Sequence, residues 1–120
     1  MTALEKEFFI APEDTALVMG SGNLQVLSTP RAIAMVENVS MLLAKEGLSP
    51  GETTVGTKID FNHTKASRVG TSIKAITTLV AREGKALTFD CRLVQEGETV
   101  AHGTHVRYIV NEERFMGKLG

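Results

Sequence analysis

A carboxylate, Glu37, lies in the middle of the largely apolar stretch from Ser28 to Gly47, whose sequence is STPRAIAMVENVSMLLAKEG. The side chains three and four positions away in a helix are Ile33, Ala34, Ser40 and Met41. An isolated charge in such surroundings is costly. Three interpretations are open: the carboxylate reaches solvent at the helix edge, it has polar partners, or desolvation raises its proton affinity so that it acts in acid–base or nucleophilic chemistry.

Three other polar residues could act with Glu37. His63 falls on the apolar face of the strand predicted over 53–65, which points its ring toward the helix, although a lone histidine there is more often a hydrogen-bonded core residue. Arg107, inside the apolar sequence THVRYIV, either neutralises Glu37 or a ligand group, or faces outward. Thr29 either caps the helix or belongs to the site. Eight helical residues span roughly 12 Å, so a substrate, a water or a second subunit would have to connect Thr29 with Glu37.

Other residues with reactive side chains are weaker candidates. His102 and His105 are three positions apart, which places them on opposite faces of a strand, so no metal site is predicted. Cys91 alternates with the apolar residues of the strand over 85–94 and is predicted to be core. The sequence GSGN at 20–23 lacks the lysine of a phosphate loop and indicates a turn or a lid hinge.

Turn signals and periodicity indicate the elements that carry these residues. A Ser-Thr-Pro start and a glycine at position 47 predict a helix over about Pro30–Glu46, with Ser28 or Thr29 as its cap. Segment 12–27 is predicted to be a loop. Alternation predicts strands over 4–11, 53–65, 70–81, 85–94 and 99–111. Within the second of these, the inner face is predicted to hold Val55, Thr57, Ile59, Phe61 and His63, and the outer face Gly56, Lys58, Asp60 and Asn62. The expected architecture is α+β, with one long helix packed on a curved antiparallel sheet.

Length and composition agree with this architecture. The 120 residues, 42% of them hydrophobic, fit one domain over 1–120. A net charge of -1 argues against broad binding to nucleic acid or to an anionic membrane. No apolar run is long enough to span a bilayer, the N-terminal sequence lacks a signal pattern, and the single Cys91 cannot form an internal disulfide. We therefore expect a soluble, cytoplasmic protein.

Several sequence pieces, in order, carry a family resemblance. They are S-T-P-x-x-I-A-x-x-E, T-T-V-G-T-x-I-x-F-x-H-T, V-G, L-T-F, G-T-H-x-R and E-R-F, and they run from Ser28 to Phe115. Together they resemble the hotdog-fold thioesterases similar to fluoroacetyl-CoA thioesterase. The resemblance implies a hotdog fold and a homodimer joined edge to edge, with an acyl-CoA thioester bound at the subunit interface. It also implies site roles: Thr29, Glu37 and His63 catalytic, Gly70 near the thioester, and Arg107 supporting the carboxylate.

The chemistry of a thioester suits these residue types. Glu37 can attack the carbonyl directly or act as general base toward water, His63 can activate water or bind the intermediate, and Thr29 can position the carbonyl or the carboxylate. Backbone amides at the helix N-terminus would be a natural place for the oxyanion. No cofactor is needed beyond coenzyme A as part of the substrate. Its phosphates would meet local positive charge from Lys65 and Arg68, with Lys58 and Lys74 on flanking strands, although a solvated strand face explains these cations equally well.

Two departures limit the resemblance. No aromatic residue occurs between Phe9 and Phe61, where the fluoroacetyl enzyme has an aromatic lid, so fluoroacetyl specificity is not predicted. After the histidine the chain reads TKASRVG in place of a proline-containing turn, which affects Gly70 more than His63.

The sequence therefore predicts a thioesterase for small or medium acyl-CoA. One alternative is a non-catalytic acyl-CoA or acyl-ligand binding module of the same fold. Another is a hydratase, for which the expected Asp near the helix start is missing, because no Asp occurs between Asp14 and Asp60. The sequence leaves open the acyl group, coenzyme A against acyl carrier protein, Glu37 as nucleophile or base, any oligomer beyond a dimer, and the role of segment 11–28.

Overall fold

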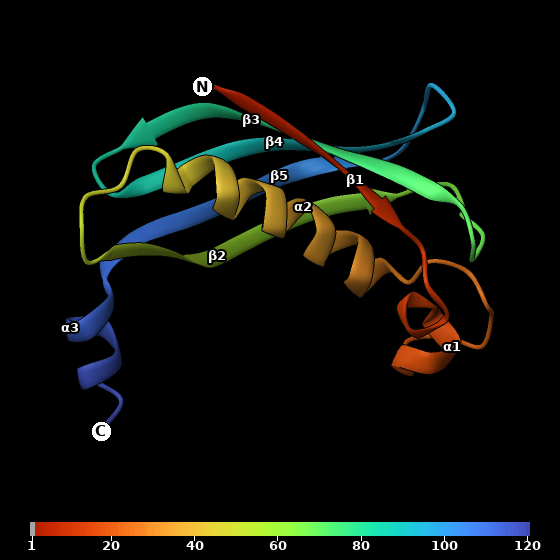
Figure 1. Cartoon of the computed structure of the whole chain (residues 1–120), viewed down its shortest axis with the longest axis horizontal. Helices are drawn as coiled ribbons and strands as arrows, with labels where there is room; N and C mark the ends of the chain where they lie inside the picture. The colour runs from red at the N-terminus through yellow and green to blue at the C-terminus, as the bar shows by residue number, and fades with distance from the viewer. Residues whose placement is uncertain (1) are drawn as a thin grey trace.

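The protein was analysed as a computed structural model, which describes residues 2–120. One long helix and five strands make up most of it (Figure 1). In chain order the elements are β1 (Ala3–Phe9), a 3-10 turn (Pro12–Asp14), α1 (Ala16–Met19), α2 (Thr29–Lys45), β2 (Glu52–His63), β3 (Ser72–Glu83), β4 (Ala86–Gln95), β5 (Glu98–Asn111) and α3 (Glu112–Gly117). The predicted α+β class and hotdog architecture are confirmed.

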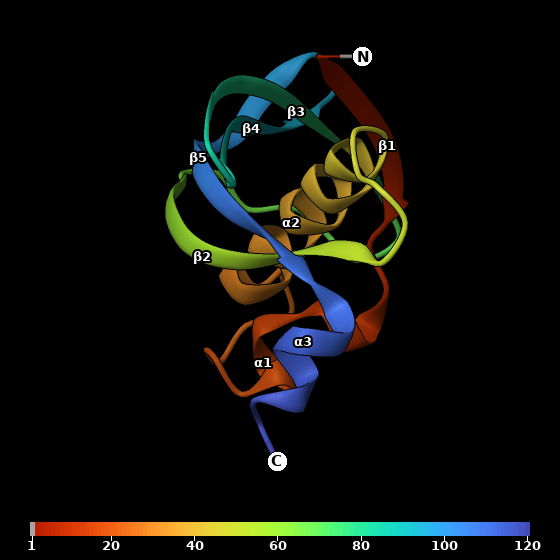
Figure 2. The same ribbon diagram turned by 90° about the vertical axis from the view of Figure 1, so that its left-hand side faces the viewer.

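The five strands form one antiparallel sheet in the order β1-β3-β4-β5-β2. The two-residue turns between β3 and β4 and between β4 and β5 make these three strands a meander. The sheet curves around α2, which Figure 2 shows nearly end on. Strands β1 and β2 are the two edges, so each has one side without a partner strand in the described chain.

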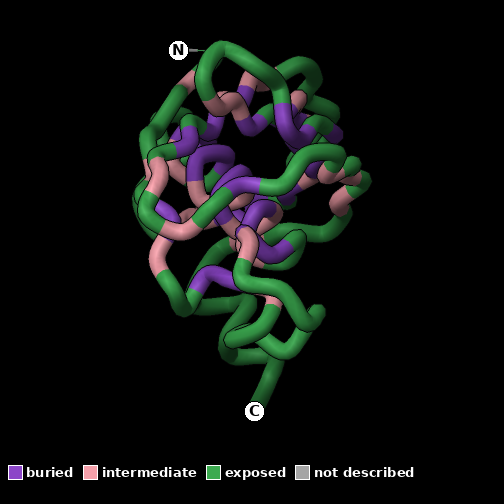
Figure 3. The backbone as a smooth tube through the Cα atoms, turned by 90° about the vertical axis from the view of Figure 1, so that its right-hand side faces the viewer, coloured by how far each residue is buried: buried purple, intermediate pink, exposed green. Residues whose placement is uncertain are grey.

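Helix α2 lies along the inner face of the sheet because one side of it is apolar. The Ser28 hydroxyl accepts a hydrogen bond from the Arg31 amide at 3.1 Å and so caps the helix, while Thr29 and Pro30 open its first turn. Its buried side chains are Ala32, Met35, Val36, Val39, Ser40, Leu43 and Ala44. Figure 3 shows the buried segments concentrated between helix and sheet, with the C-terminal end of the chain exposed.

A β-bulge changes which residues of β2 face the helix. The pairing of β2 with β5 shifts between Gly56 and Lys58, so Thr57 is an extra residue in the strand. After the bulge the predicted inner residues Ile59, Phe61 and His63 do alternate inward, but before it Thr54 is buried and Gly56 points at the helix. The predicted outward position of Gly56 and inward positions of Val55 and Thr57 are therefore wrong, because one extra residue reverses the alternation.

Short helices occupy both regions that the sequence pattern left without structure. The segment predicted as loop holds α1, where the Thr15 hydroxyl accepts from the Val18 amide at 3.3 Å. The Ser28 hydroxyl donates to the sulfur of Met19 at 2.8 Å, which ties α1 to the start of α2. At the other end, Asn111 caps α3. Among residues 2–120, no helix combines the length and the apolar character needed to cross a membrane.

Gly103 of β5 lies against the backbone of β2, and the first prediction tests this contact. A Cβ atom on Gly103 would lie 2.0 Å from the Asp60 carbonyl oxygen and 2.7 Å from the Phe61 Cα. Gly103→Ala is therefore expected to lower the free energy of unfolding by about 2 kcal/mol or more, because two backbones must separate. Urea unfolding measures the change. The matched control is Gly117→Ala, where a Cβ meets nothing within 4 Å. Equal stability of the two variants would contradict the prediction.

Candidate active site

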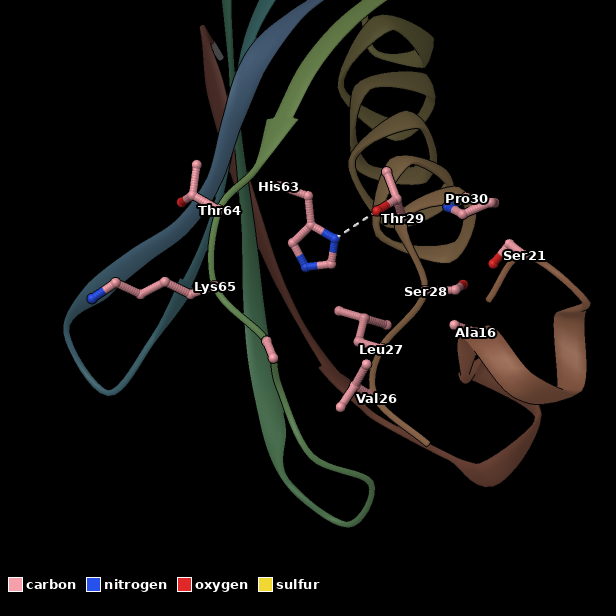
Figure 4. A pocket seen from close by; sticks show the side chains of 11 residues that line it. Ala16, Ser21, Val26, Leu27, Ser28, Thr29, Pro30, His63, Thr64 and Lys65 are labelled. Atoms are coloured by element: carbon pink, nitrogen blue, oxygen red, sulfur yellow. Dashed lines mark hydrogen bonds between the residues drawn. The ribbon is translucent and has the colours of Figure 1, made fainter. Parts of the chain in front are cut away.

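A pocket of about 280 Å³ opens at the N-terminal end of α2 (Figure 4). It lies between α1, the segment leading into α2, and the end of β2. Its lining consists of Ala16, Ser21, Val26, Leu27, Ser28, Thr29, Pro30, His63, Thr64, Lys65 and Ala66. Two of the three predicted catalytic residues, Thr29 and His63, therefore share one pocket.

Thr29 and His63 are hydrogen-bonded to each other. The Thr29 hydroxyl oxygen lies 2.9 Å from Nδ1 of His63. Nε2 of the same ring is buried and has no hydrogen-bond partner within residues 2–120. Burial lowers the pKa of His63, and the backbone of Lys65 opposes this. The imidazole is thus held at Nδ1, while Nε2 is a buried nitrogen without a partner among the described residues.

The amides at the start of α2 are largely used by the helix cap. The Arg31 amide donates to the Ser28 hydroxyl, the Ala32 amide donates to the Ser28 carbonyl at 2.9 Å, and Pro30 has no N–H. Capping therefore uses part of the amide set at the helix start, and an oxyanion site on the backbone amides there stays a prediction.

Glu37 lies in a different place from this pocket. Helix α2 and strand β2 run in opposite directions, so the helix start lies near His63 and the middle of the helix lies near Gly56 (Figure 1). A Cβ on Gly56 would be 3.5 Å from Oε2 of Glu37, which places the half-buried carboxylate over this glycine. Gly56 and His63 are roughly 20 Å apart along the strand. The expected meeting of Glu37 with His63 in one chain therefore does not occur.

Arg107 is the cation nearest to Glu37 in this cluster, and it is 8% exposed. Its Nε donates to the Thr54 hydroxyl at 2.8 Å and its Nη2 donates to the Thr54 carbonyl at 3.0 Å. Burial lowers the pKa of the Arg107 guanidinium, and the Glu37 carboxylate opposes this. Arg107 therefore faces inward, and the outward-facing alternative is wrong. That it neutralises Glu37 or a ligand group stays a prediction.

Two residues of the Glu37 cluster were missed by the sequence interpretation. Gly56 was placed on the outer face, yet a Cβ there would be 3.1 Å from the His105 ring and 3.4 Å from Nη1 of Arg107. His105 was considered only as half of a metal pair, yet its ring is fully buried and bonded to Arg107. A spacing of two in a strand puts His105 and Arg107 on one face, and that signal was available.

Comparison with known proteins decides the family. A family model described as fluoroacetyl-CoA-specific thioesterase matches residues 10–113. The chain belongs to this family. It is a thioester hydrolase.

The relatives agree in sequence and in structure. This chain is 26% identical to the fluoroacetyl-CoA thioesterase of Streptantibioticus cattleyicolor over 95 aligned residues. The aligned region covers 79% of this chain and 68% of the relative. A crystal structure of the fluoroacetyl-CoA thioesterase FlK matches with a TM-score of 0.91 at 23% identity, covering 98% of this chain and 91% of that one. A hot-dog-like protein from Thermanaerovibrio acidaminovorans matches with a TM-score of 0.90 at 17% identity, covering 98% and 87%.

The other residues predicted to bind substrate lie around the pocket without converging in it. Gly70 is in the turn before β3 with φ of 85°, and its amide donates to the Ile10 carbonyl at 2.8 Å. Lys65 lines the pocket with its backbone end, while its ammonium turns away and pairs with Glu98 (Figure 4). Arg68 is exposed beside the pocket segment 26–27. Their contact with substrate stays a prediction for this thioesterase.

The remaining candidates behave as the strand pattern predicted. Cys91 is fully buried, and burial raises the pKa of its thiol to about 11. His102 is exposed and bonds Asp90 at 3.0 Å, whereas His105 is buried on the opposite face. Within the described residues no group of three His, Cys, Asp or Glu side chains could hold a metal ion.

The buried neutral histidines predict a pH dependence of stability. Because the pKa values of His63 and His105 are lowered in the folded state, the unfolded chain binds more protons below the ordinary histidine pKa of about 6.5. Their contribution to stability is full above that pH and decreases as the pH falls through it. Urea unfolding between about pH 7 and pH 5 is expected to show this decrease, and His63→Gln should make it shallower. Identical slopes for the variant and the wild type would contradict the prediction.

Cys91 offers a second test of the core. A thiol with a pKa of about 11 and no exposed surface is expected not to react with a disulfide reagent at neutral pH in the native protein. It should react fully in denaturant, and Cys91→Ala should keep thioesterase activity within about threefold, because the thiol takes no part in the site. Rapid labelling of the native protein would show that the sheet opens at β4.

Proposed function

We propose that this thioesterase hydrolyses a small or medium acyl-CoA to the free acid and coenzyme A, using Glu37, His63 and Thr29. The hydrogen bond between Thr29 and Nδ1 of His63, inside a pocket, is the observation that carries the proposal. It orients an imidazole whose other nitrogen lacks a partner in the described chain, as a group that exchanges protons with substrate or water requires.

Glu37 supplies the carboxylate of the reaction. In one route its oxygen attacks the thioester carbonyl, the carbon–sulfur bond breaks, the thiolate takes a proton, and water then hydrolyses the acyl anhydride and restores Glu37. In the other route Glu37 removes a proton from the attacking water, and that proton passes to the leaving thiol. In both routes Arg107 is the buried cation beside the Glu37 carboxylate. The separation of Glu37 from His63 means that the substrate, a water or a second subunit connects the two groups.

The size of the pocket and one relative support the substrate class. About 280 Å³ lies at the lower limit of ligand pockets, which suits a short acyl group. A crystal structure of a variant of the related FlK contains fluoroacetate and CoA. In this chain the pocket lining contains no Phe, Tyr or Trp, so the proposal does not extend to fluoroacetyl specificity. The chemistry requires side chains and water and no further cofactor.

A homodimer joined through β2 is part of the proposal. The outer edge of β2 has no partner strand in the described chain, and Gly56, Thr57 and Lys58 on it are exposed. A second β2 strand, antiparallel across a two-fold axis, would continue the sheet and bring two copies of the α2–β2 contact together.

Release of thiol from a panel of acyl-CoA thioesters tests the catalytic roles. Glu37→Gln is expected to lower kcat by about 100- to 10,000-fold, and His63→Gln by about 100-fold. Thr29→Val should lower kcat by only about tenfold, because the Thr29 hydroxyl acts indirectly, by orienting His63. The length of the acyl group in the thioester that is hydrolysed fastest indicates how long an acyl group the pocket accommodates.

The matched control is Glu83→Gln, an exposed carboxylate at the end of β3, which should turn over like the wild type. Calorimetric titration with coenzyme A checks that Glu37→Gln still binds. Equal turnover of Glu37→Gln and wild type would overturn the role of Glu37. Binding without turnover by the wild type would favour the binding-module alternative.

A further inference from the structure

His105 is a fully buried histidine that the proposed chemistry does not use. It lies on β5 beneath α2, and its ring stacks with that of Phe89 at a centroid distance of 6.4 Å. Both ring nitrogens are hydrogen-bonded: Nδ1 lies 2.8 Å from the Lys58 carbonyl oxygen, and Nε2 lies 3.2 Å from Nη1 of Arg107. A histidine held at both nitrogens has one orientation, so its position in the cluster is fixed.

The partners of His105 determine its tautomer. A guanidinium can only donate, so Nε2 of His105 must accept from Arg107. The ring proton then lies on Nδ1, which donates to the Lys58 carbonyl just after the β-bulge. Burial and the adjacent Arg107 lower the pKa of His105, while the Lys58 carbonyl and Glu37 oppose this. The ring is therefore neutral, as its acceptor role requires.

The bond to His105 completes the fixation of Arg107. Nε and Nη2 of the guanidinium are both bonded to Thr54 on β2, and Nη1 is bonded to His105. Nη1 and Oε2 of Glu37 lie beside the same residue, because they would be 3.4 Å and 3.5 Å from a Cβ on Gly56. Without an acceptor at position 105, Nη1 would lose its hydrogen bond to His105, and the end of the guanidinium beside Gly56 would be less firmly held.

We propose that His105 is a positioning residue of the carboxylate site, which fixes the Arg107 guanidinium opposite Glu37 by accepting its Nη1–H. The inference rests on the proposed function for the role of Glu37, but the anchoring of Arg107 is independent of activity. The groups that face Glu37 are Arg107 and His105 from β5 and the Cys91 thiol from β4. Of these, Arg107 alone carries a positive charge, so its position determines where that charge lies relative to the carboxylate.

The first measurement is nitrogen NMR of the wild-type protein labelled at its three histidines. His105 is expected as the Nδ1–H tautomer at neutral pH. The Arg107 Nε–H proton should exchange with water at least about tenfold faster in His105→Phe than in the wild type, because the guanidinium loses one of its hydrogen-bond acceptors. An Nε2–H tautomer or unchanged exchange at Arg107 would overturn the proposal.

The second measurement is thioester hydrolysis by matched variants. His105→Phe keeps a ring in contact with Phe89 but removes the acceptor, and it should lower kcat by about 10- to 100-fold with KM nearly unchanged. His105→Gln restores an acceptor and should recover activity to within about tenfold of the wild type. His102→Phe, on the exposed face of the same strand, is the control and should match the wild type.

The outcomes separate this inference from the proposed function. A folded His105→Phe with wild-type kcat would overturn the positioning role even if the enzyme is a thioesterase as proposed. If the wild type hydrolyses no thioester, the proposed function fails, and the exchange rate at Arg107 still decides whether His105 anchors it. If His105→Phe does not fold, the activity of His105→Gln and the tautomer of His105 in the wild type decide whether His105 positions Arg107.

Discussion

The site depends on one constraint: the negative charge of a carboxylate on the sheet-facing side of a helix must be balanced. Glu37 projects from α2 toward β2, where an uncompensated charge would be unfavourable. Arg107 meets this need from β5, but a buried guanidinium needs acceptors of its own, and Thr54 and His105 supply them. Each polar group in this series therefore offsets part of the free-energy cost of burying the next one.

The backbone of β2 is adapted to the same cluster. Glu37 reaches the Arg107 layer because Gly56 has no side chain, and a Cβ there would be 3.1 Å from His105. The bulge that follows brings the Lys58 carbonyl within 2.8 Å of His105. The glycine and the bulge, which would each weaken an ordinary strand, therefore open the space that the polar groups fill.

The sequence predicted the fold and most of the inner faces, because those depend on periodicity and on turn residues. The alternation of β4 correctly placed Cys91 in the core, and the Ser-Thr-Pro start located α2 to within one residue. The family motif identified the chemistry. The position of Gly56 could not be predicted, because an extra residue in a strand leaves the local composition unchanged while it reverses the face of every residue on one side of it.

The separation of the two polar sites was also beyond the sequence. Thr29 and Glu37 are eight residues apart on a helix, which rises about 1.5 Å per residue, whereas Gly56 and His63 are seven apart on a strand, which rises about 3.3 Å. Predicting that both pairs meet requires knowing where the helix crosses the strand, and that depends on packing. The result is that His63 meets Thr29 and that Glu37 meets the Arg107 cluster.

The bulge at Thr57 also determines how this strand can change in evolution or in the laboratory. Residues with even numbers before it and odd numbers after it face the helix, so the two halves of β2 obey opposite parity rules. A library that randomised every second position along the strand would alter the helix-facing layer in one half and the outer surface in the other. Deletion of Thr57 itself would leave the remaining residues in unbroken alternation and keep both halves of the strand on their present faces, so a one-residue change of length should be better tolerated at the bulge than elsewhere in the strand.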